Sequence, residues 1–153
     1  MKRTLLLICT LLCANVLMAQ EQLAVLRHND STSVFYGASA FVQAYNAATH
    51  GDIITLSDGI FSTPNSINKA ITVRGNGAQA DTTRRSTGTY FMEYFTLTND
   101  TLEFVAEGIY FNYFKDNAAN CEIKLSKCII RYCESIYNAE ITNCIIRTSR
   151  FNI

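Results

Sequence analysis

The sequence predicts an all-β protein whose short strands stack as the coils of a parallel β-solenoid, with one short helix near the N-terminus. The main observation is an internal repeat in the last third of the chain. The tetrapeptide CIIR at 128–131 recurs at 144–147, an offset of 16, and NCEI at 120–123 recurs as NAEI at 138–141, an offset of 18. A looser copy, GIYF, lies at 108–111, at an offset of 20 from the first CIIR. A period of about 16–20 residues is too short for helical repeats, and it fits units that bury their apolar faces only by stacking.

Residues 1–19 have the parts of a secretory signal peptide: a basic start, an apolar run at 5–12, and small residues that lead to a cleavage site expected after Ala19. The apolar run is too short to span a membrane. Residues 20–153 are therefore expected to form one short β-helix domain, exported to the periplasm, the cell surface or the extracellular space. No membrane span is expected in it.

A short helix is predicted before the first coil. Ser39 is its expected N-cap, and Gly51 is its expected C-cap. Such a short helix must pack on a neighbour. Residues 20–31 are expected to be polar and frayed apart from the apolar stretch 23–26, and 32–36 are expected to form an edge strand. The apolar residues of the helix fall on one face at i, i+3, i+4 and i+7, namely Phe41, Ala44, Tyr45 and Ala48.

Two apolar strands follow the helix, at 52–56 and 67–73, and glycine-containing turns close both. Their ITL and ITV cores start at Ile54 and Ile71, an offset of 17. The remaining segments are expected to be a polar loop at 78–89 and aromatic-rich strands at 90–97 and 102–114.

The stretch from Phe41 to Gly77 also carries a series of spaced motifs: A-x-x-A in the helix, then G-D-x-I-x-L, G-x-F and K-x-I-x-V-x-G-x-G. The residues that carry them are Ala44, Ala47, Ala48, Gly51, Asp52, Ile54, Leu56, Gly59, Phe61, Lys69, Ile71, Val73, Gly75 and Gly77. This series resembles the N-terminal cap and first coils of the right-handed parallel β-helix proteins of the pectin-lyase-like group. The resemblance implies that fold, with the helix closing the N-terminal end of the solenoid.

Four cysteines follow the predicted signal peptide: Cys121, Cys128, Cys133 and Cys144. Export permits disulfides, and four cysteines allow three full pairings. We expect small buried side chains instead. Cys128 and Cys144 are equivalent in the repeat, so they should stack in the core with parallel directions that suit a disulfide poorly. Cys133 lies outside the repeat and is the expected free thiol.

The charges exclude one class of partner and leave few catalytic candidates. Without residues 1–19, 11 basic and 13 acidic residues remain, a net charge of −2. A nucleic-acid surface needs a basic patch, so nucleic acid is not an expected partner. Glu122 and Glu140 lie one repeat apart and could bind a cation or act as an acid–base pair, but we interpret them as solvated. No catalytic residue, metal or cofactor is expected.

Five residues are candidates for ligand binding. A row of exposed rings can stack on sugar faces, and strand alternation places about half of the aromatic residues outward. An outward arginine ladder could grip an anionic glycan. The candidates are Tyr94, Tyr110, Tyr113, Arg131 and Arg147, and carbohydrate is the candidate partner.

The last predicted strand, at 144–146, has no capping segment after it. An uncapped coil predicts either self-association through that end or a sequence truncated there. We therefore expect an exported non-catalytic β-helix module, structural or surface-binding, with glycan as the ligand class. The alternative is an N-terminal fragment of a polysaccharide lyase or glycoside hydrolase of the pectin-lyase-like fold. Clustered outward carboxylates on adjacent coils would favour that alternative.

Overall fold

The computed structural model of the protein describes residues 21–79, 87–98, 103–118 and 120–150. The predicted signal peptide, and residues 80–86 of the predicted loop, lie outside the described residues. The elements are β1 (Leu23–His28), β2 (Ser31–Tyr36), α2 (Ala40–Ala47), β3 (Ile53–Leu56), β4 (Gly59–Phe61), β5 (Ile71–Arg74), β6 (Thr89–Leu97), β7 (Glu103–Glu107), β8 (Tyr110–Asp116), β9 (Glu122–Ser126), β10 (Ile129–Glu134), β11 (Ala139–Thr142) and β12 (Ile145–Arg150).

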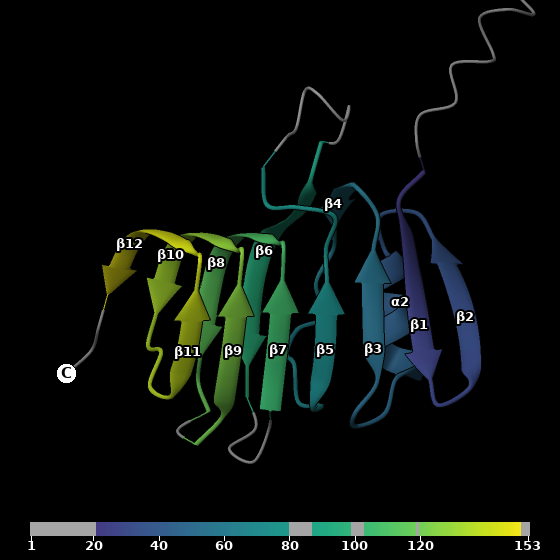
Figure 1. Ribbon diagram of the computed structural model, residues 1–153, viewed down its shortest axis with the longest axis horizontal. Coiled ribbons are helices and arrows are strands. Elements are labelled where there is room, and N and C mark those ends of the chain that lie inside the picture. Colours follow the sequence, from purple (N-terminus) through teal and green to yellow (C-terminus); the bar gives the residue numbers. More distant parts are fainter. Residues whose placement is uncertain (1–20, 80–86, 99–102, 119, 151–153) are drawn as a thin grey trace, which may run out of the picture.

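From β3 onward the chain winds through two sheets in turn, and this confirms the predicted parallel β-solenoid, of about four turns. One sheet has the order β11-β9-β7-β5-β3-β1-β2, and the other has the order β12-β10-β8-β6-β4. All pairs in the coils are parallel, whereas β1 pairs antiparallel with both β2 and β3. Figure 1 shows the seven-stranded sheet in front and the five-stranded sheet behind it.

The core lies between the two sheets because alternate residues of each strand point inward. In the seven-stranded sheet Val73 pairs with Ala106, and Ala106 pairs with Leu125. All three are buried. The other sheet contributes most of a phenylalanine cluster, which Phe41 of the helix joins. Its fully buried members are Phe41, Phe61, Phe91, Phe95, Phe104, Phe111 and Phe114.

The N-terminal end is closed by a hairpin and the helix. In Figure 1, α2 lies behind β1 and β3, where the five-stranded sheet has no strand. The predicted edge strand exists as β2. The stretch 23–26, which was excepted from the predicted fraying, lies in β1, but the strand extends to His28 and pairs with both β2 and β3, so the fraying predicted beyond 26 is wrong. Asn29, at φ 50°, makes the tight turn between the hairpin strands, since asparagine tolerates the left-handed region well.

The helix has different caps from those predicted. It ends at Ala47, and Ala48 is the C-cap, so Gly51, at φ 90°, lies in the turn before β3. Ser39 occupies the N-cap position, but its side chain makes no capping hydrogen bond. The end of the helix is instead stabilised by Lys69, whose Nζ donates to the carbonyl oxygens of Tyr45, Asn46 and Ala48 at 2.7, 3.2 and 2.8 Å.

The strand registers confirm one predicted spacing and correct three. Ile129 pairs with Ile145, at the predicted offset of 16. Ala139 pairs with Ile123, so that offset is also 16 and not 18. Ile54 pairs with Val73, at an offset of 19 and not 17. The offset of 20 predicted between GIYF at 108–111 and the first CIIR is one too large, because β8 and β10 pair with an offset of 19.

The cysteines behave as predicted. Cys121, Cys128 and Cys133 are buried, Cys144 is partly buried, and all four are free thiols. The backbone N–H of Cys128 donates to the Sγ of Cys144 at 3.3 Å, as neighbours on stacked coils. Burial raises the pKa of the Cys128 thiol to about 12.

In the last described coil, two isoleucines at core positions are partly exposed. Ile141 continues the row of Leu125 but is 39% exposed, and Ile146 continues the row of Ile130 but is 38% exposed. Equivalent residues in inner coils are fully buried because a further coil covers them.

Candidate ligand-binding groove

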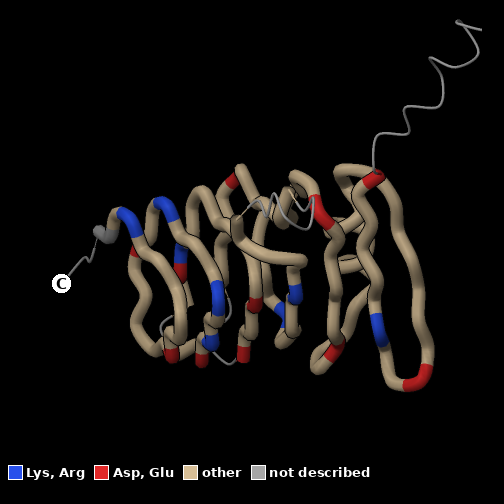
Figure 2. Tube along the Cα trace, turned by 45° about the horizontal axis from the view of Figure 1, so that its top comes forward, with Lys and Arg blue, Asp and Glu red and all other residues tan. Residues whose placement is uncertain are grey.

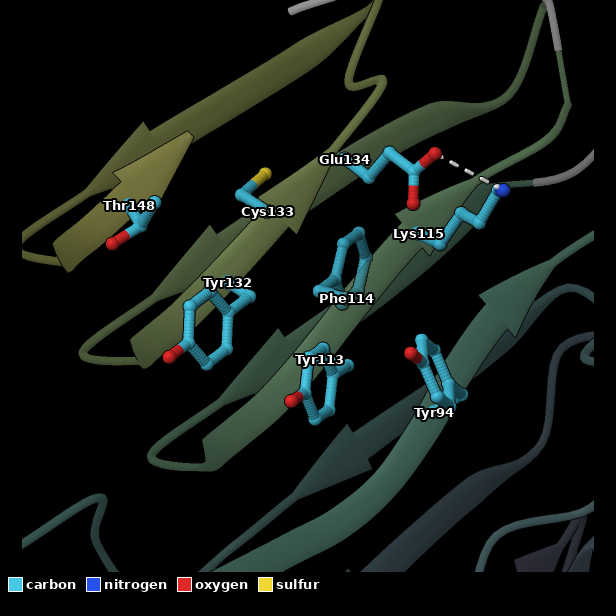
Figure 3. A pocket seen from close by; sticks show the side chains of 8 residues that line it. All are labelled: Tyr94, Tyr113, Phe114, Lys115, Tyr132, Cys133, Glu134 and Thr148. Atoms are coloured by element: carbon cyan, nitrogen blue, oxygen red, sulfur yellow. Dashed lines mark hydrogen bonds and ion pairs between the residues drawn. The ribbon is translucent and has the colours of Figure 1, made fainter. Parts of the chain in front are cut away.

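Three tyrosines form a row across neighbouring coils on the outer face of the five-stranded sheet. Tyr94 in β6 pairs with Tyr113 in β8, and Tyr113 pairs with Tyr132 in β10. The residue after each of them, Phe95 in β6 for example, points inward and is buried. Figure 3 shows the three rings side by side on successive strands. We call Tyr94, Tyr113 and Tyr132 the tyrosine ladder.

The rings of the tyrosine ladder stack on one another. The centroids of Tyr94 and Tyr113 are 4.5 Å apart at an interplanar angle of 22°. Those of Tyr113 and Tyr132 are 4.9 Å apart at 14°. These separations match the spacing of strands in a sheet, so the rings lie nearly perpendicular to the solenoid axis. The ladder therefore presents ring edges and hydroxyl groups outward, and the faces between neighbouring rings are covered.

A shallow groove of about 350 Å³ runs beside the tyrosine ladder across β6, β8, β10 and β12. Lys115 and Glu134, each two positions after a ladder tyrosine, form its second row. The Lys115 Nζ and a Glu134 carboxylate oxygen are 3.2 Å apart (Figure 3). Thr148 of β12 continues the line of the ladder at its C-terminal end. The groove is thus lined by phenol rings, one ion pair and a hydroxyl group, together with Phe114 and Cys133.

The pairing of β6 with β8 shifts register between Phe91 and Tyr94, and we call this irregular point the bend. Contacts at the bend hold the tyrosine ladder in place. Asn112 is buried at this bend, and its Nδ2 donates to the carbonyl oxygen of Met92 at 3.0 Å. A guanidinium nitrogen of Arg131 donates to the Asn112 Oδ1 at 3.3 Å. The same guanidinium lies over the Tyr132 ring, 5.0 Å from its centroid. Arg131 therefore connects the bend to the last ring of the ladder.

The structure brings together part of the predicted site. Tyr94 and Tyr113 line the groove, and Arg131 contacts its wall. Tyr110 belongs to a second row nearer the start of each strand, where it contacts Tyr90 at 5.3 Å between centroids. Arg147 is exposed on β12.

Tyr132 was missed by the sequence reasoning, although a signal exists. Tyr94, Tyr113 and Tyr132 follow one another at a constant offset of 19, and Lys115 and Glu134 share this offset. The offset is also that of β8 and β10. Reading the aromatic segments at one constant offset would have found the complete ladder.

Glu122 and Glu140, which the repeat places one coil apart and which we interpreted as solvated, are not neighbours. Because β9 and β11 pair at an offset of 16, Glu140 faces Lys124, whereas Glu122 faces Glu103. Lys124 bridges these last two carboxylates, at 2.7 Å to Glu103 and 2.9 Å to Glu122. At this point the sheet therefore carries a charge cluster in which one lysine bridges two carboxylates.

A second polar cluster joins the hairpin to the first coil. Asp52 is buried, and His28 Nδ1 lies 2.8 Å from its Oδ1. Thr49 donates from its N–H and its hydroxyl to the other carboxylate oxygen. Thr49 and Asp52 both hydrogen-bond to Nδ1 of His28, while the side-chain amide of Asn29 hydrogen-bonds to Nε2. A hydrolytic triad needs the nucleophile and the carboxylate on different ring nitrogens, so this cluster is structural.

Burial raises the pKa of Asp52, but the Thr49 and His28 hydrogen bonds and the His28 charge lower it more, so the net pKa lies below its usual value. The carboxylate is thus favoured in the folded protein.

Charges and metal ligands show no further concentration in the described parts of the chain. Figure 2 shows Lys and Arg interspersed with Asp and Glu along the coils. Among the described residues, no three His, Cys, Asp or Glu side chains lie close enough to hold a metal ion together. No helix in these same segments has the length and apolar character needed to cross a bilayer. Comparison of the chain with protein-family models, with curated proteins and with solved structures finds no match.

Proposed function

We propose that the protein is an exported, non-catalytic β-helix module of the pectin-lyase-like kind, which binds carbohydrate in the groove beside the tyrosine ladder. The observation that supports this is the run of outward phenol rings along a groove that also offers an ion pair and a hydroxyl group. The resemblance of residues 41–77 to the pectin-lyase-like group supports the family part of the proposal.

Sugars suit this surface for a chemical reason. A pyranose ring has an apolar face of C–H groups and a rim of hydroxyl groups. Aromatic side chains bind the first, and phenol, carboxylate and ammonium groups hydrogen-bond to the second. Binding sites for small ligands combine mostly apolar walls with a few polar groups in the same way.

Isothermal titration calorimetry tests the proposal with a panel of hexasaccharides: β-1,4-glucan, β-1,3-glucan, xylan, mannan and polygalacturonate. We expect at least one of them to bind, and the triple variant Tyr94→Ala, Tyr113→Ala, Tyr132→Ala to lose that binding. The control is Tyr36→Ala with Tyr137→Ala, because both side chains are strongly exposed, at 59% and 61%, and lie outside the groove. Absence of any binding would contradict the proposal, and release of new reducing ends would contradict its non-catalytic part.

We propose secondly that the last described coil pairs with a second copy of the chain. The partial exposure of Ile141 and Ile146 supports this, because exposed core residues and unpaired strand edges of a solenoid favour association. Sedimentation velocity should show a dimer that dissociates on dilution. The variant Ile141→Lys with Ile146→Lys should remain monomeric, and a wild-type protein that is monomeric at high concentration would refute this proposal.

A further inference from the structure

Resting on the proposed function, we infer that Tyr94 is the residue that stacks on sugar. We also infer that the ligand is a linear, uncharged glycan, with one ring on the open face of Tyr94 and the next sugars along the tyrosine ladder toward Thr148. Tyr94 thereby has a role that Tyr113 and Tyr132 lack, and the groove is expected to bind neutral glycans in preference to acidic ones.

The three rings differ in how much of their faces they offer. Tyr113 lies between the other two rings, at 4.5 and 4.9 Å, so both of its faces are covered. Tyr132 stacks on Tyr113 at 4.9 Å and also has the Arg131 guanidinium over its ring, 5.0 Å from the centroid, and it is 36% exposed. Tyr94 has Tyr113 on one face, and no ring or guanidinium of the described residues contacts its other face. Its exposure of 60% agrees with one open face.

The covered rings have another use. In Figure 3 the hydroxyl groups of Tyr113 and Tyr132 lie on the side of the ring row that faces away from the Lys115–Glu134 pair. A sugar that passes them can accept hydrogen bonds from the phenols or donate to them, but it finds less free ring surface to stack on than at Tyr94. Removing one of these hydrogen bonds should therefore weaken binding less than removing the single stacking face.

The charge of the groove favours an uncharged ligand. Its lining holds one cation and one anion, Lys115 and Glu134, which pair at 3.2 Å. Arg131, which contacts the wall of the groove, already donates to Asn112 and lies over Tyr132. A carboxylated glycan would have to displace one of these contacts to gain an ion pair, whereas a neutral glycan needs only hydrogen bonds from the groups as they stand.

The direction of the groove favours a linear chain. The groove crosses β6, β8, β10 and β12 and so follows the solenoid axis. The coils repeat at about 4.8 Å, which is on the order of the length of one sugar residue. Successive sugars of an extended chain can thus face successive coils.

Titration calorimetry of single variants with cellohexaose and with hexagalacturonate tests the inference. For cellohexaose we expect Tyr94→Ala to bind at least about tenfold more weakly, which corresponds to about 1.4 kcal/mol. Tyr94→Phe, which keeps the ring face, should stay within about twofold of wild type, and Tyr132→Ala within about threefold, as expected for one lost hydrogen bond. Tyr137→Ala is the matched control, since its side chain is as exposed as that of Tyr94 and lies outside the groove. Circular dichroism spectra should show that each variant is folded.

The outcomes separate this inference from the proposed function. If Tyr94→Ala binds cellohexaose like wild type while the triple tyrosine variant does not bind it, the assignment of Tyr94 is wrong and the groove remains the site. If wild type prefers hexagalacturonate, the neutral-ligand assignment is wrong. If wild type binds neither these two glycans nor the rest of the panel, both the proposed function and the inference fail.

Discussion

Replacing Phe95 by alanine should lower the free energy of unfolding far more than replacing its neighbour Tyr94 by alanine. The two residues are adjacent in β6, but Phe95 is fully buried and Tyr94 is 60% exposed. Loss of a buried phenylalanine costs about 3–5 kcal/mol, and we expect about 4 kcal/mol because Phe95 lies at the centre of the aromatic cluster. Its ring centroid lies 5.0–6.1 Å from those of Phe41, Phe91, Phe104, Phe111 and Phe114.

The control change, Tyr94→Ala, removes one ring stack and should cost about 1 kcal/mol. In a domain of this size each kcal/mol lost lowers the melting temperature by about 3 °C, so Phe95→Ala should lower it by about 12 °C. The loss is a large part of the total stability of a domain, which is about 5–15 kcal/mol. The chain has no tryptophan, so urea and thermal unfolding would be followed by far-ultraviolet circular dichroism. If the two variants lost equal stability, or if Phe95→Ala lost less than about 1 kcal/mol, the inward and outward assignment of β6 would be refuted.

Three further changes test other parts of the structure. Lys69→Met keeps the aliphatic stem but removes the three hydrogen bonds to the end of α2, so urea unfolding should show a loss of about 2 kcal/mol; no loss would exclude the capping role. Asp52 has a lowered folded-state pKa, so its contribution is present above about pH 4 and is lost as the pH falls through that pKa. Asp52→Asn should therefore lower the melting temperature at pH 7 and flatten its decline in acid, and an unchanged acid decline would contradict this. At pH 8 iodoacetamide should modify Cys144 before Cys128, because Cys128 is buried and burial raises its pKa; peptide mass mapping that finds the reverse order would contradict the stacking of the last coil.

The solenoid could be predicted because its strands carry a local signal. Each coil needs apolar residues at alternate positions and a turn, and both features can be read over a short stretch around Ile54, Ile71 and Cys128. The resemblance also included Lys69, whose role in capping the helix then became visible from its three carbonyl contacts.

The registers were harder because a strand that slips by two positions keeps the same side chains inward. Matching Ile123 to Ile141 by letter gave an offset of 18, although the coils pair at an offset of 16. This error aligned Glu122 with Glu140, although Glu140 faces Lys124. The turn at Asn29 was missed for a different reason: it lacks the glycine that marks most two-residue hairpins.

The tyrosine ladder becomes visible only when segments of neighbouring coils are compared, and its ring contacts require the tertiary structure. An outward position for Tyr94 follows from alternation, but the stacking of its neighbour on one face depends on the constant offset of 19 between coils. The contact of Arg131 with the Tyr132 ring depends on the hydrogen bond that Arg131 makes to Asn112. These contacts determine which ring face stays open.

A tyrosine-ring NMR titration tests the central claim most directly. The chain has eight tyrosines, so a protein with selectively labelled tyrosine rings gives a spectrum simple enough to assign by single substitutions. On addition of cellohexaose, we predict that the ring signals of Tyr94 shift most, that those of Tyr113 and Tyr132 shift less, and that those of Tyr36 and Tyr137 do not move. Shifts confined to tyrosines outside the groove, or no shift at a saturating concentration of any glycan in the panel, would contradict the account.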